Sequence, residues 1–332
     1  MVSWKLRCPK CGLELENMYR HRCPVCGSPL NLSVKDLDWK PGSVMGEGRT
    51  PLVERRINGK TVLFKLEYLN PSGSFKDRGT SINIHIARLL GYDCIVEDSS
   101  GNAGISAALY GAYTGMKTKI IVPRSAPQGK KKIIRNLGAQ LILAKTRKAA
   151  AELAETLAGE CYYIAHAWNP FFTLGLQSIA YEIAAKGYVG VPVIAPASTG
   201  GLIYALYQGF REYANRTPRI IAAQGSSNPW LAEAVGGTIE KGESTLADAL
   251  VYEDPPRKEE AIRAIEKSGG TAVAVNDRSI KRAMKELWRM GFPVEPSSAT
   301  AYAVYKKIAG KHIEGPAIIV LTGTGYKYLD AL

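Results

Sequence analysis

The sequence predicts an α/β protein built from two open parallel sheets, with a small cysteine-rich module at its N-terminus. Short apolar strands alternate with amphipathic helices along most of the chain, which is the pattern of repeated βαβ units. The length of 332 residues fits two domains of ordinary size and one small extra module. Four of the six cysteines lie within the first 26 residues, which sets that module apart.

The N-terminal module, residues 1–33, carries two Cys-x-x-Cys-Gly turns separated by eleven residues. Two such turns on facing hairpins can direct four thiolates at one point, and this spacing is typical of a zinc ribbon. Four protein ligands leave no open position, so the Zn²⁺ would be structural; two disulfides are the alternative. The expected ligands are Cys8, Cys11, Cys23 and Cys26. Cys94 and Cys161 lie in apolar runs, and we expect both to be buried thiols of the core.

The next elements follow in order along the chain. Asn58-Gly59 predicts a hairpin between two strands, and the spacing of apolar residues predicts a helix over 77–91. Residues 225–260 have little pattern. Further strands are expected at 93–98, 116–123, 139–144, 161–167, 190–197, 219–225, 271–277 and 317–325. The helices expected between them cover about 102–115, 130–138, 147–158, 173–187, 201–213, 277–291 and 298–310.

The composition excludes some classes of protein. The net charge is +13, but Lys and Arg are scattered as on a solvated Lys/Glu-rich surface. Nucleic acid is not an expected partner, because basic and aromatic residues interleave only at 18–22, MYRHR. There is no apolar run of about 18–20 residues, and the N-terminus does not have the apolar core of a signal peptide. We expect a cytoplasmic protein with no membrane association.

Three loops rich in Gly, Ser and Thr lead into helices, at 72–76, 99–104 and 198–201. Such loops present free backbone N–H groups and the positive end of a helix dipole, which suits a phosphate or carboxylate. Neither nucleotide-binding glycine motif is present. The first loop ends in Lys76, whose amine could form a Schiff base with a carbonyl. Pyridoxal phosphate has both a phosphate and an aldehyde, whereas the plain alternative is a solvated lysine at a helix start, which the dipole disfavours.

Seven motifs occur in this order: GEGRTPL, NPSGSFKDRG, SSGNAG, NPFFTLGLQSIAYEI, STGGL, VEPSSA and LTGTGYK. Through them, residues 45–330 resemble the β-family, or fold-type II, of pyridoxal-phosphate enzymes, most closely its threonine synthase-like members. Some of these carry an N-terminal zinc ribbon. The resemblance implies a tryptophan synthase β-like fold, with a large cofactor-binding domain (34–83 and 171–332) and a small mobile domain (84–170). It also implies a homodimer acting on a small amino-acid substrate.

The resemblance implies a role for each matched residue. Lys76 would be the covalent anchor of the cofactor and would move protons at the α- and β-carbons of the substrate. Asn102 would bind the ring hydroxyl, and Thr322 would face the pyridine nitrogen. Ser99 and Ser100, with Asn102, would hold the substrate carboxylate. The phosphate cradle would be Ser198, Thr199, Gly200 and Gly201.

The substrate segment departs from the threonine synthase pattern. Those enzymes carry a segment like NSINPFRLEGQKT, whereas this chain reads HAWNPFFTLGLQSI, with Ala167, Phe172 and Ser178 in place of Ser, Arg and Lys. Ala103 stands where threonine is usual. Phenylalanine cannot replace the forked donor of arginine, although His166, Lys130 or another basic residue could restore phosphate binding.

Two enzyme hypotheses therefore remain, with a third from another class. The first is a threonine synthase of threonine biosynthesis, which converts O-phospho-L-homoserine and water to L-threonine and phosphate. The second is a dehydratase or β-replacement enzyme acting on serine, threonine or O-phosphoserine. The third is a nucleic-acid-binding zinc-ribbon protein. The sequence leaves open the true substrate, any effector and what the ribbon contacts.

Overall fold

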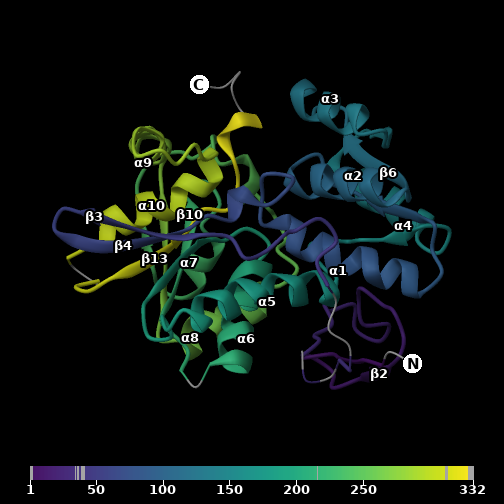
Figure 1. The fold of residues 1–332 in the computed structure, drawn as a ribbon, viewed down its shortest axis with the longest axis horizontal. Helices are drawn as coiled ribbons and strands as arrows, with labels where there is room; N and C mark the ends of the chain where they lie inside the picture. The colour runs from purple at the N-terminus through teal and green to yellow at the C-terminus, as the bar shows by residue number, and fades with distance from the viewer. Residues whose placement is uncertain are drawn as a thin grey trace. The chain divides into compact units, whose positions relative to one another are not determined.

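The computed structural model describes residues 3–33, 35, 37–38, 42–214, 216–310 and 313–327 (Figure 1). The chain forms two compact units. The first unit contains residues 1–48 and 70–176, and the second contains 49–69 and 177–332. The first helix, α1 (Lys76–Leu89), groups with the first unit. The predicted boundary between the large and small domains lies at residue 83, within this helix, whereas the division into compact units keeps the whole helix in the first unit.

The first unit is built on a parallel sheet in the order β7-β6-β5-β8. Its strands are β5 (Cys94–Glu97), β6 (Lys117–Pro123), β7 (Gln140–Ala144) and β8 (Tyr162–Tyr163). The helices between them are α2 (Asn102–Thr114), α3 (Gln128–Asn136) and α4 (Arg147–Leu157). Successive strands alternate with helices as predicted, and Figure 1 shows α2 and α4 beside β6.

Strand β8 is shorter than the predicted strand 161–167, and the backbone explains the difference. Ala165 takes a left-handed conformation, with φ of 46°, and the N–H groups of Trp168 and Asn169 bond back to its carbonyl. The chain therefore turns sharply after β8. Helix α5 (Pro170–Ala185) then begins three residues before the predicted position, because Asn169 accepts a hydrogen bond from Phe171 N–H at 2.9 Å. Asn169 is an N-cap and Pro170 suits the first turn.

The N-terminal ribbon packs on this same turn. Its strands β1 (Lys5–Arg7) and β2 (Glu14–Glu16) pair antiparallel. The Tyr19 hydroxyl donates to the Tyr163 carbonyl, and its ring lies 4.5 Å from that of Tyr162. His21 contacts Glu155 of α4 at 3.0 Å, and this contact contributes most to lowering the pKa of that carboxyl. The guanidinium of Arg22 lies 3.8 Å from the centre of the Trp168 ring.

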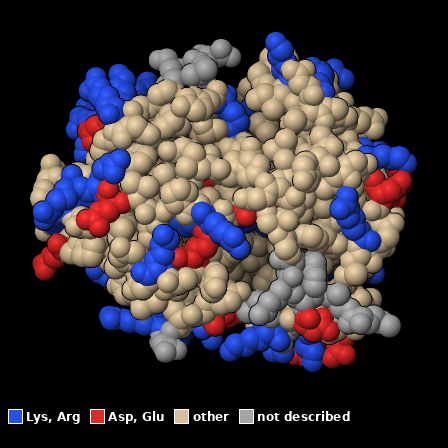
Figure 2. All heavy atoms as spheres, in the orientation of Figure 1, with Lys and Arg blue, Asp and Glu red and all other residues tan. Residues whose placement is uncertain are grey.

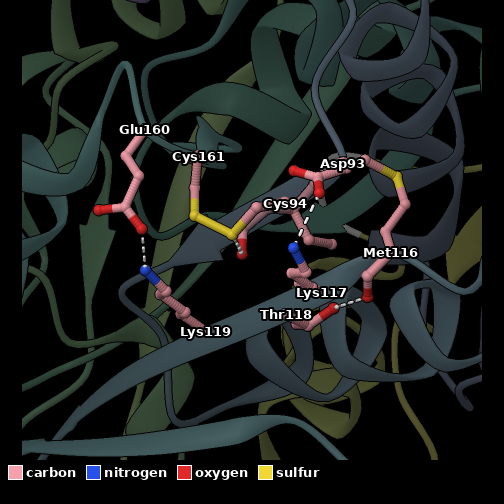
Figure 3. Close-up of a disulfide and its surroundings, with 9 residues drawn as sticks. Asp93, Cys94, Met116, Lys117, Thr118, Lys119, Glu160 and Cys161 are labelled. Carbon is pink, nitrogen blue, oxygen red and sulfur yellow. Dashed lines mark hydrogen bonds and ion pairs between the residues drawn. A yellow bond between two sulfur atoms is a disulfide. The ribbon is translucent and has the colours of Figure 1, made fainter.

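The prediction for the two core cysteines is wrong in one respect. Cys94 and Cys161 are buried as expected, but they form a disulfide rather than remaining thiols (Figure 3). Cys94 begins β5, and Cys161 precedes β8, the neighbouring parallel strand. Strand pairing brings their Cα atoms to 4.6 Å, although 67 residues separate them in sequence. That distance lies within the range a disulfide requires.

The second unit is built on a seven-stranded sheet in the order β11-β12-β10-β9-β13-β4-β3. Only β3 pairs antiparallel within it. Asn58 and Gly59 both have positive φ, as a type I′ turn requires, and they join β3 to β4 as predicted. The strands are β3 (Leu52–Ile57), β4 (Lys60–Lys65), β9 (Val193–Pro196), β10 (Ile220–Gly225), β11 (Thr238–Ile239), β12 (Thr271–Val275) and β13 (Ala317–Val320).

Helices cover both faces of this sheet. Figure 1 shows α9 and α10 above it and α6 and α8 below it. Ile280, Leu287 and Tyr302 of the upper pair pack with Phe64 and Ile194 of the strands in one buried cluster. The helices are α6 (Gly201–Tyr213), α7 (Trp230–Ala234), α8 (Lys258–Lys267), α9 (Asp277–Arg289) and α10 (Pro296–Ile308).

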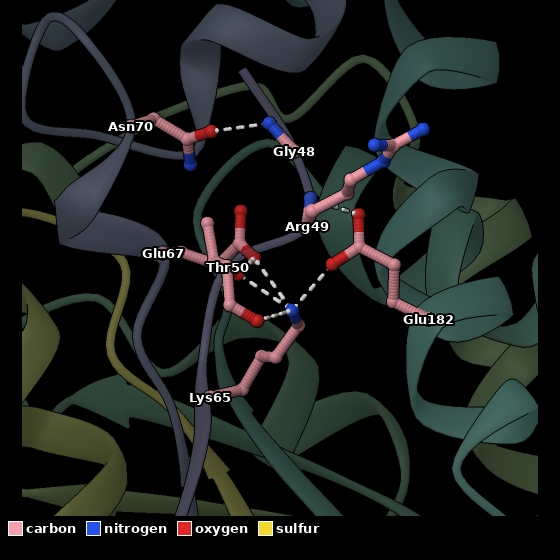
Figure 4. A network of polar contacts seen from close by, with 7 residues as sticks. All are labelled: Gly48, Arg49, Thr50, Lys65, Glu67, Asn70 and Glu182. Atoms are coloured by element: carbon pink, nitrogen blue, oxygen red, sulfur yellow. Dashed lines mark hydrogen bonds and ion pairs between the residues drawn. The ribbon is translucent and has the colours of Figure 1, made fainter. Parts of the chain in front are cut away.

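A buried polar network ties the start of β3 to β4 and α5 (Figure 4). Lys65 is 1% exposed, and its Nζ lies 2.5 Å from Glu182 Oε2 and 2.6 Å from the carbonyl of Thr50. The Thr50 hydroxyl donates to Glu67, and the Arg49 N–H donates to Glu182. A buried lysine needs such partners, so the network gives the Arg-Thr-Pro part of GEGRTPL a structural role.

The surface agrees with the prediction of scattered basic charge. On the face drawn in Figure 2, Lys and Arg lie in separate groups with Asp and Glu between them. Tyr19, His21 and Arg22 of the MYRHR segment are engaged with the first unit, as described above. None of the described helices is both long enough and apolar enough to span a membrane.

Candidate active site

Lys76 is the first residue of α1 and is partly exposed. The residue after it holds the preceding loop in place. The carboxylate of Asp77 is fully buried and accepts hydrogen bonds from the Ser72 N–H at 2.6 Å and the Ser72 hydroxyl at 2.5 Å. Gly73, with φ of 80°, closes the turn by bonding to the Asn70 carbonyl. The loop before Lys76 is therefore rigid, which is a requirement for placing a reactive amine.

Aromatic rings flank the amine of Lys76. Its Nζ lies 4.7 Å from the centre of the Phe75 ring and 5.6 Å from that of Phe172 on α5. Phe172 is 1% exposed and lies flat on Gly79, where an added Cβ would be only 2.5 Å from the ring. One turn along α5, a Cβ at Gly175 would lie 2.2 Å from the Arg78 carbonyl oxygen. The two glycines let the helices approach closely and fix Phe172 beside Lys76.

The predicted substrate-carboxylate residues lie at the start of α2, in the same unit. Ser99 and Ser100 follow β5, and Asn102 is the first residue of α2. A Cβ at Gly104 would lie 1.8 Å from the Ser99 carbonyl oxygen, so this tight loop requires glycine there. Helices α1 and α2 are joined near these ends, because the Ser106 hydroxyl donates to Asp77 at 2.6 Å. The unit therefore brings the N-terminal turns of α1 and α2 side by side.

In the second unit, the Ser198–Gly201 loop joins β9 to α6. Gly200 has φ of 86°, and a Cβ there would lie 2.4 Å from the Arg257 carbonyl oxygen. The Thr199 carbonyl accepts the Arg257 N–H, and the Ser198 carbonyl accepts the Trp230 indole N–H at 3.0 Å. The carbonyls of Ser198 and Thr199 are thus hydrogen-bonded to neighbouring residues. The first N–H groups of α6 lie at a helix N-terminus, where N–H groups can donate to a ligand.

Thr322 follows β13, the parallel neighbour of β9, and is 3% exposed. The turn before α10 packs on it, since Glu295 N–H donates to the Gly323 carbonyl at 3.0 Å. Gly323 lets the Glu295 carboxylate approach, because an added Cβ would lie 2.4 Å from its oxygen. The buried hydroxyls of Ser297 and Ser298 have no hydrogen-bond partner among the described residues. Buried hydroxyls without protein partners are available to a polar ligand.

Sequence reasoning missed one polar cluster in the first unit. Glu97 is the last residue of β5, Asp98 follows it and His166 follows β8, and one ligand atom from each lies within 4.8 Å of the others. His166 Nδ1 lies 2.5 Å from Glu97 Oε1. Burial and the neighbouring Glu97 raise the pKa of Asp98 to about 6, opposed by His166 and by the Tyr163 hydroxyl, which donates to it. The sequence predicts a strand across 161–167, so it does not predict the turn that brings His166 to these carboxylates.

The four ribbon cysteines converge as the spacing predicts. Their sulfur atoms all lie within 4.8 Å of one another, with 3.4 Å between Cys8 and Cys26 and 3.6 Å between Cys11 and Cys23. None of the four is in a disulfide. A tetrahedral zinc with bonds of about 2.3 Å separates its sulfurs by about 3.8 Å. The arrangement therefore has the dimensions of a zinc site.

The lysine position of the substrate segment needs one correction. Counted from the shared Asn169-Pro170-Phe171, it falls on Gln177 rather than Ser178. Gln177 is 1% exposed, and its amide has no hydrogen-bond partner among the described residues. Of the other departures, Ala103 and Ala167 are both buried.

Comparison with known proteins places this site in a family. Residues 44–325 match the family model described as pyridoxal-phosphate dependent enzyme. The match covers most of the chain and includes Lys76, Asn102, the Ser198–Gly201 loop and Thr322, but not the ribbon cysteines. The protein belongs to this family of pyridoxal-phosphate dependent enzymes, and the fold-type II resemblance is confirmed.

The similar curated proteins narrow the class. A threonine synthase of Methanocaldococcus jannaschii is 33% identical, over 86% of this chain and 76% of its own length. One from Bacillus sp. (strain ULM1) is 32% identical over 87% of this chain and 86% of its own. A third, from Methanosarcina acetivorans, is 29% identical over 98% of this chain and 92% of its own.

Solved structures share the fold. The structure of an O-ureido-L-serine synthase superposes with a TM-score of 0.73 at 24% identity, covering 88% of this chain and 94% of that one. A serine racemase from Dictyostelium discoideum gives a TM-score of 0.70 at 25% identity, covering 83% and 92%. The predicted α/β class with parallel sheets is confirmed.

Proposed function

We propose that the protein is a threonine synthase-like lyase that converts O-phospho-L-homoserine and water to L-threonine and phosphate. The bond from the γ-carbon to the phosphate oxygen breaks, hydroxyl adds at the β-carbon and a proton is delivered to the γ-carbon. The observation that carries the proposal is the identity of about 30% to several threonine synthases over most of the chain. The rigid Lys76 loop supports it.

Each predicted residue keeps its proposed role. Pyridoxal phosphate, when bound, withdraws electrons from the substrate's α-carbon. Lys76 would anchor it and carry protons between the α- and β-carbons, and the rings of Phe75 and Phe172 would keep water from its amine. Thr322 would face the ring nitrogen. Asn102 would donate to the ring hydroxyl, and Ser99 and Ser100 would hold the substrate carboxylate. The phosphate would bind at the N-terminus of α6, through Ser198, Thr199, Gly200 and Gly201.

The experiment for this proposal uses the purified holoenzyme. It should release phosphate from O-phospho-L-homoserine and form threonine in equal amount, measured by a phosphate assay and by chromatography. Lys76→Ala should lose both turnover and the visible absorption band of the bound cofactor. Phosphate release without threonine would contradict the synthase reaction, and an unchanged absorption band would contradict the role of Lys76.

A second candidate is β-elimination or β-replacement on serine, threonine or O-phosphoserine. The observation in its favour is Phe172, a buried ring where threonine synthases have a forked phosphate donor. Turnover of L-serine or L-threonine to a 2-oxo acid, faster than turnover of O-phospho-L-homoserine, would favour this candidate.

We further propose that Cys8, Cys11, Cys23 and Cys26 hold one structural Zn²⁺, that the protein is a cytoplasmic homodimer, and that residues 84–170 form the mobile small domain. Convergence of the four sulfurs supports the zinc site. Elemental analysis of anaerobically prepared protein should find one zinc per chain. Nucleic acid is not a proposed partner, because the basic segment of the ribbon is engaged with the first unit.

A further inference from the structure

The substrate of the proposed reaction carries a phosphate, yet the segment expected to bind it has no basic residue at the matched positions. Phe172 replaces the forked donor and is buried against Gly79. A cation must therefore come from another position near Lys76, because an anionic leaving group needs a donor that is ordered before it arrives.

His166 is the basic side chain that the turn after β8 places there. Its ring centre lies 6.0 Å from that of Phe172, and the same Phe172 ring lies 5.6 Å from Lys76 Nζ. Phe172 is thus the shared neighbour of the histidine and the lysine. The left-handed Ala165 directs the chain out of the strand immediately before His166.

The hydrogen bonding of His166 leaves one ring nitrogen for a ligand. Nδ1 is bound to the Glu97 carboxylate, which is 0% exposed. Within the described part of the chain, no residue pairs with Nε2. A carboxylate behind Nδ1 fixes the orientation of the ring and stabilises the imidazolium once an anion binds at Nε2. The histidine side chain is 17% exposed, so a ligand can reach it.

We propose that His166, oriented by Glu97, binds the phosphate leaving group of the substrate through Nε2 and so replaces the missing arginine. This rests on the proposed function, because it assumes a phosphorylated amino-acid substrate. The enzyme would then bind the phosphate through one imidazole N–H group instead of the two parallel N–H groups of an arginine guanidinium. Such a site holds a terminal phosphate but imposes less geometry on it.

The test uses the holoenzyme and two readouts: KM for O-phospho-L-homoserine, and inhibition by inorganic phosphate. His166→Gln should raise KM and the inhibition constant of phosphate together by about tenfold or more, with a smaller change in kcat. Glu97→Gln should shift both in the same direction and serves if His166→Gln does not fold. His21→Gln, which breaks another His–Glu pair in the same unit, is the matched control and should change neither.

The outcomes separate this inference from the proposed function. If the wild type turns over O-phospho-L-homoserine and His166→Gln changes neither constant, the inference is overturned while the function stands. If the wild type does not use that substrate, inorganic phosphate is tested as an inhibitor of whichever amino acid it converts. Inhibition that His166→Gln weakens supports the anion site although the proposed function fails. No inhibition, or inhibition that His166→Gln leaves unchanged, overturns the inference as well.

Discussion

The disulfide between Cys94 and Cys161 gives the most quantitative prediction. It closes a loop of 67 residues that contains α2, α3, α4 and every strand of the first unit's parallel sheet except β8. In the chain-entropy treatment, a cross-link over such a loop stabilises the folded state by about 4 kcal/mol. Because both sulfurs are buried between β5 and α4, reduction would also leave two thiols in the core.

The effect should be local, and hydrogen exchange can measure it. We expect the slowest amides of β5, β6 and β8 to exchange about a thousandfold faster after reduction, since each 1.4 kcal/mol is a factor of ten. Amides of β9 and β13, in the second unit, should change much less. The measurement compares oxidised and TCEP-reduced protein by mass spectrometry, with the disulfide first located by non-reducing peptide mapping.

The double variant Cys94→Ala/Cys161→Ala is the control for the ribbon. TCEP could also act on the four ribbon cysteines, which are in no disulfide, and any change in exchange caused through them would persist in the double variant. The variant should exchange like reduced wild type and ignore TCEP. The reasoning is refuted if mapping finds no peptide linked through Cys94 and Cys161, or if exchange in β5 and β8 is the same with and without reductant.

Three further predictions concern single side chains. Asp98→Asn should stabilise the folded protein by about 3 kcal/mol at pH 8. The pKa of the Asp98 carboxyl is raised to about 6 in the folded state, so ionisation of this group destabilises the fold as the pH rises through that value, and an amide avoids this cost. The gain should vanish below pH 4, where the carboxyl is protonated in both states. Urea melts of wild type and variant at both pH values check this. A stability difference that is the same at both pH values, as expected for exposed Asp254→Asn, would contradict it. Gly200→Ala should weaken cofactor binding at least tenfold in an absorbance titration, about 1.4 kcal/mol, because its Cβ would meet the Arg257 carbonyl. Gly236 also has a positive φ but lies in open space, so Gly236→Ala is the control, and equal effects of the two substitutions on cofactor binding would refute the steric argument. Tyr19→Phe should cost about 1–3 kcal/mol in protection of residues 162–171, because the Tyr163 carbonyl loses its donor, whereas exposed Tyr113→Phe should not; exchange unchanged in both would show that the ribbon does not brace this turn.

Local patterns predicted most elements of the fold. Asn58-Gly59 is a hairpin turn, and the strands predicted at 93–98, 116–123 and 139–144 are present as β5, β6 and β7 of one sheet, because short apolar runs between helices have few other ways to be buried. The CxxC spacing predicted the cysteine cluster, since each turn depends only on neighbouring residues. These features share one property: their determinants lie close together in sequence.

Features set by distant contacts could not be predicted. The disulfide depends on β5 and β8 being neighbours, which no spacing in the sequence reveals. Helix α8 is not predicted, because residues 225–260 have little pattern. Arg257, immediately before this helix, packs against the Gly200 loop. The apolar run 161–167 predicts a strand through Ala165, whose backbone is instead left-handed, because alanine has no side chain that marks a turn.

The buried position of Phe172 decides how the substrate segment can evolve or be redesigned. Restoring arginine at this position would place its stem against Gly79, where the Phe172 ring now lies flat, and would bury a charge in a site only 1% exposed. An unpaired buried cation costs several kcal/mol, so Phe172→Arg should destabilise the first unit before it gains a phosphate contact. Phe172 therefore fills the space between α1 and α5, and in the site that we propose the phosphate contact would come from His166, whose ring lies against that of Phe172.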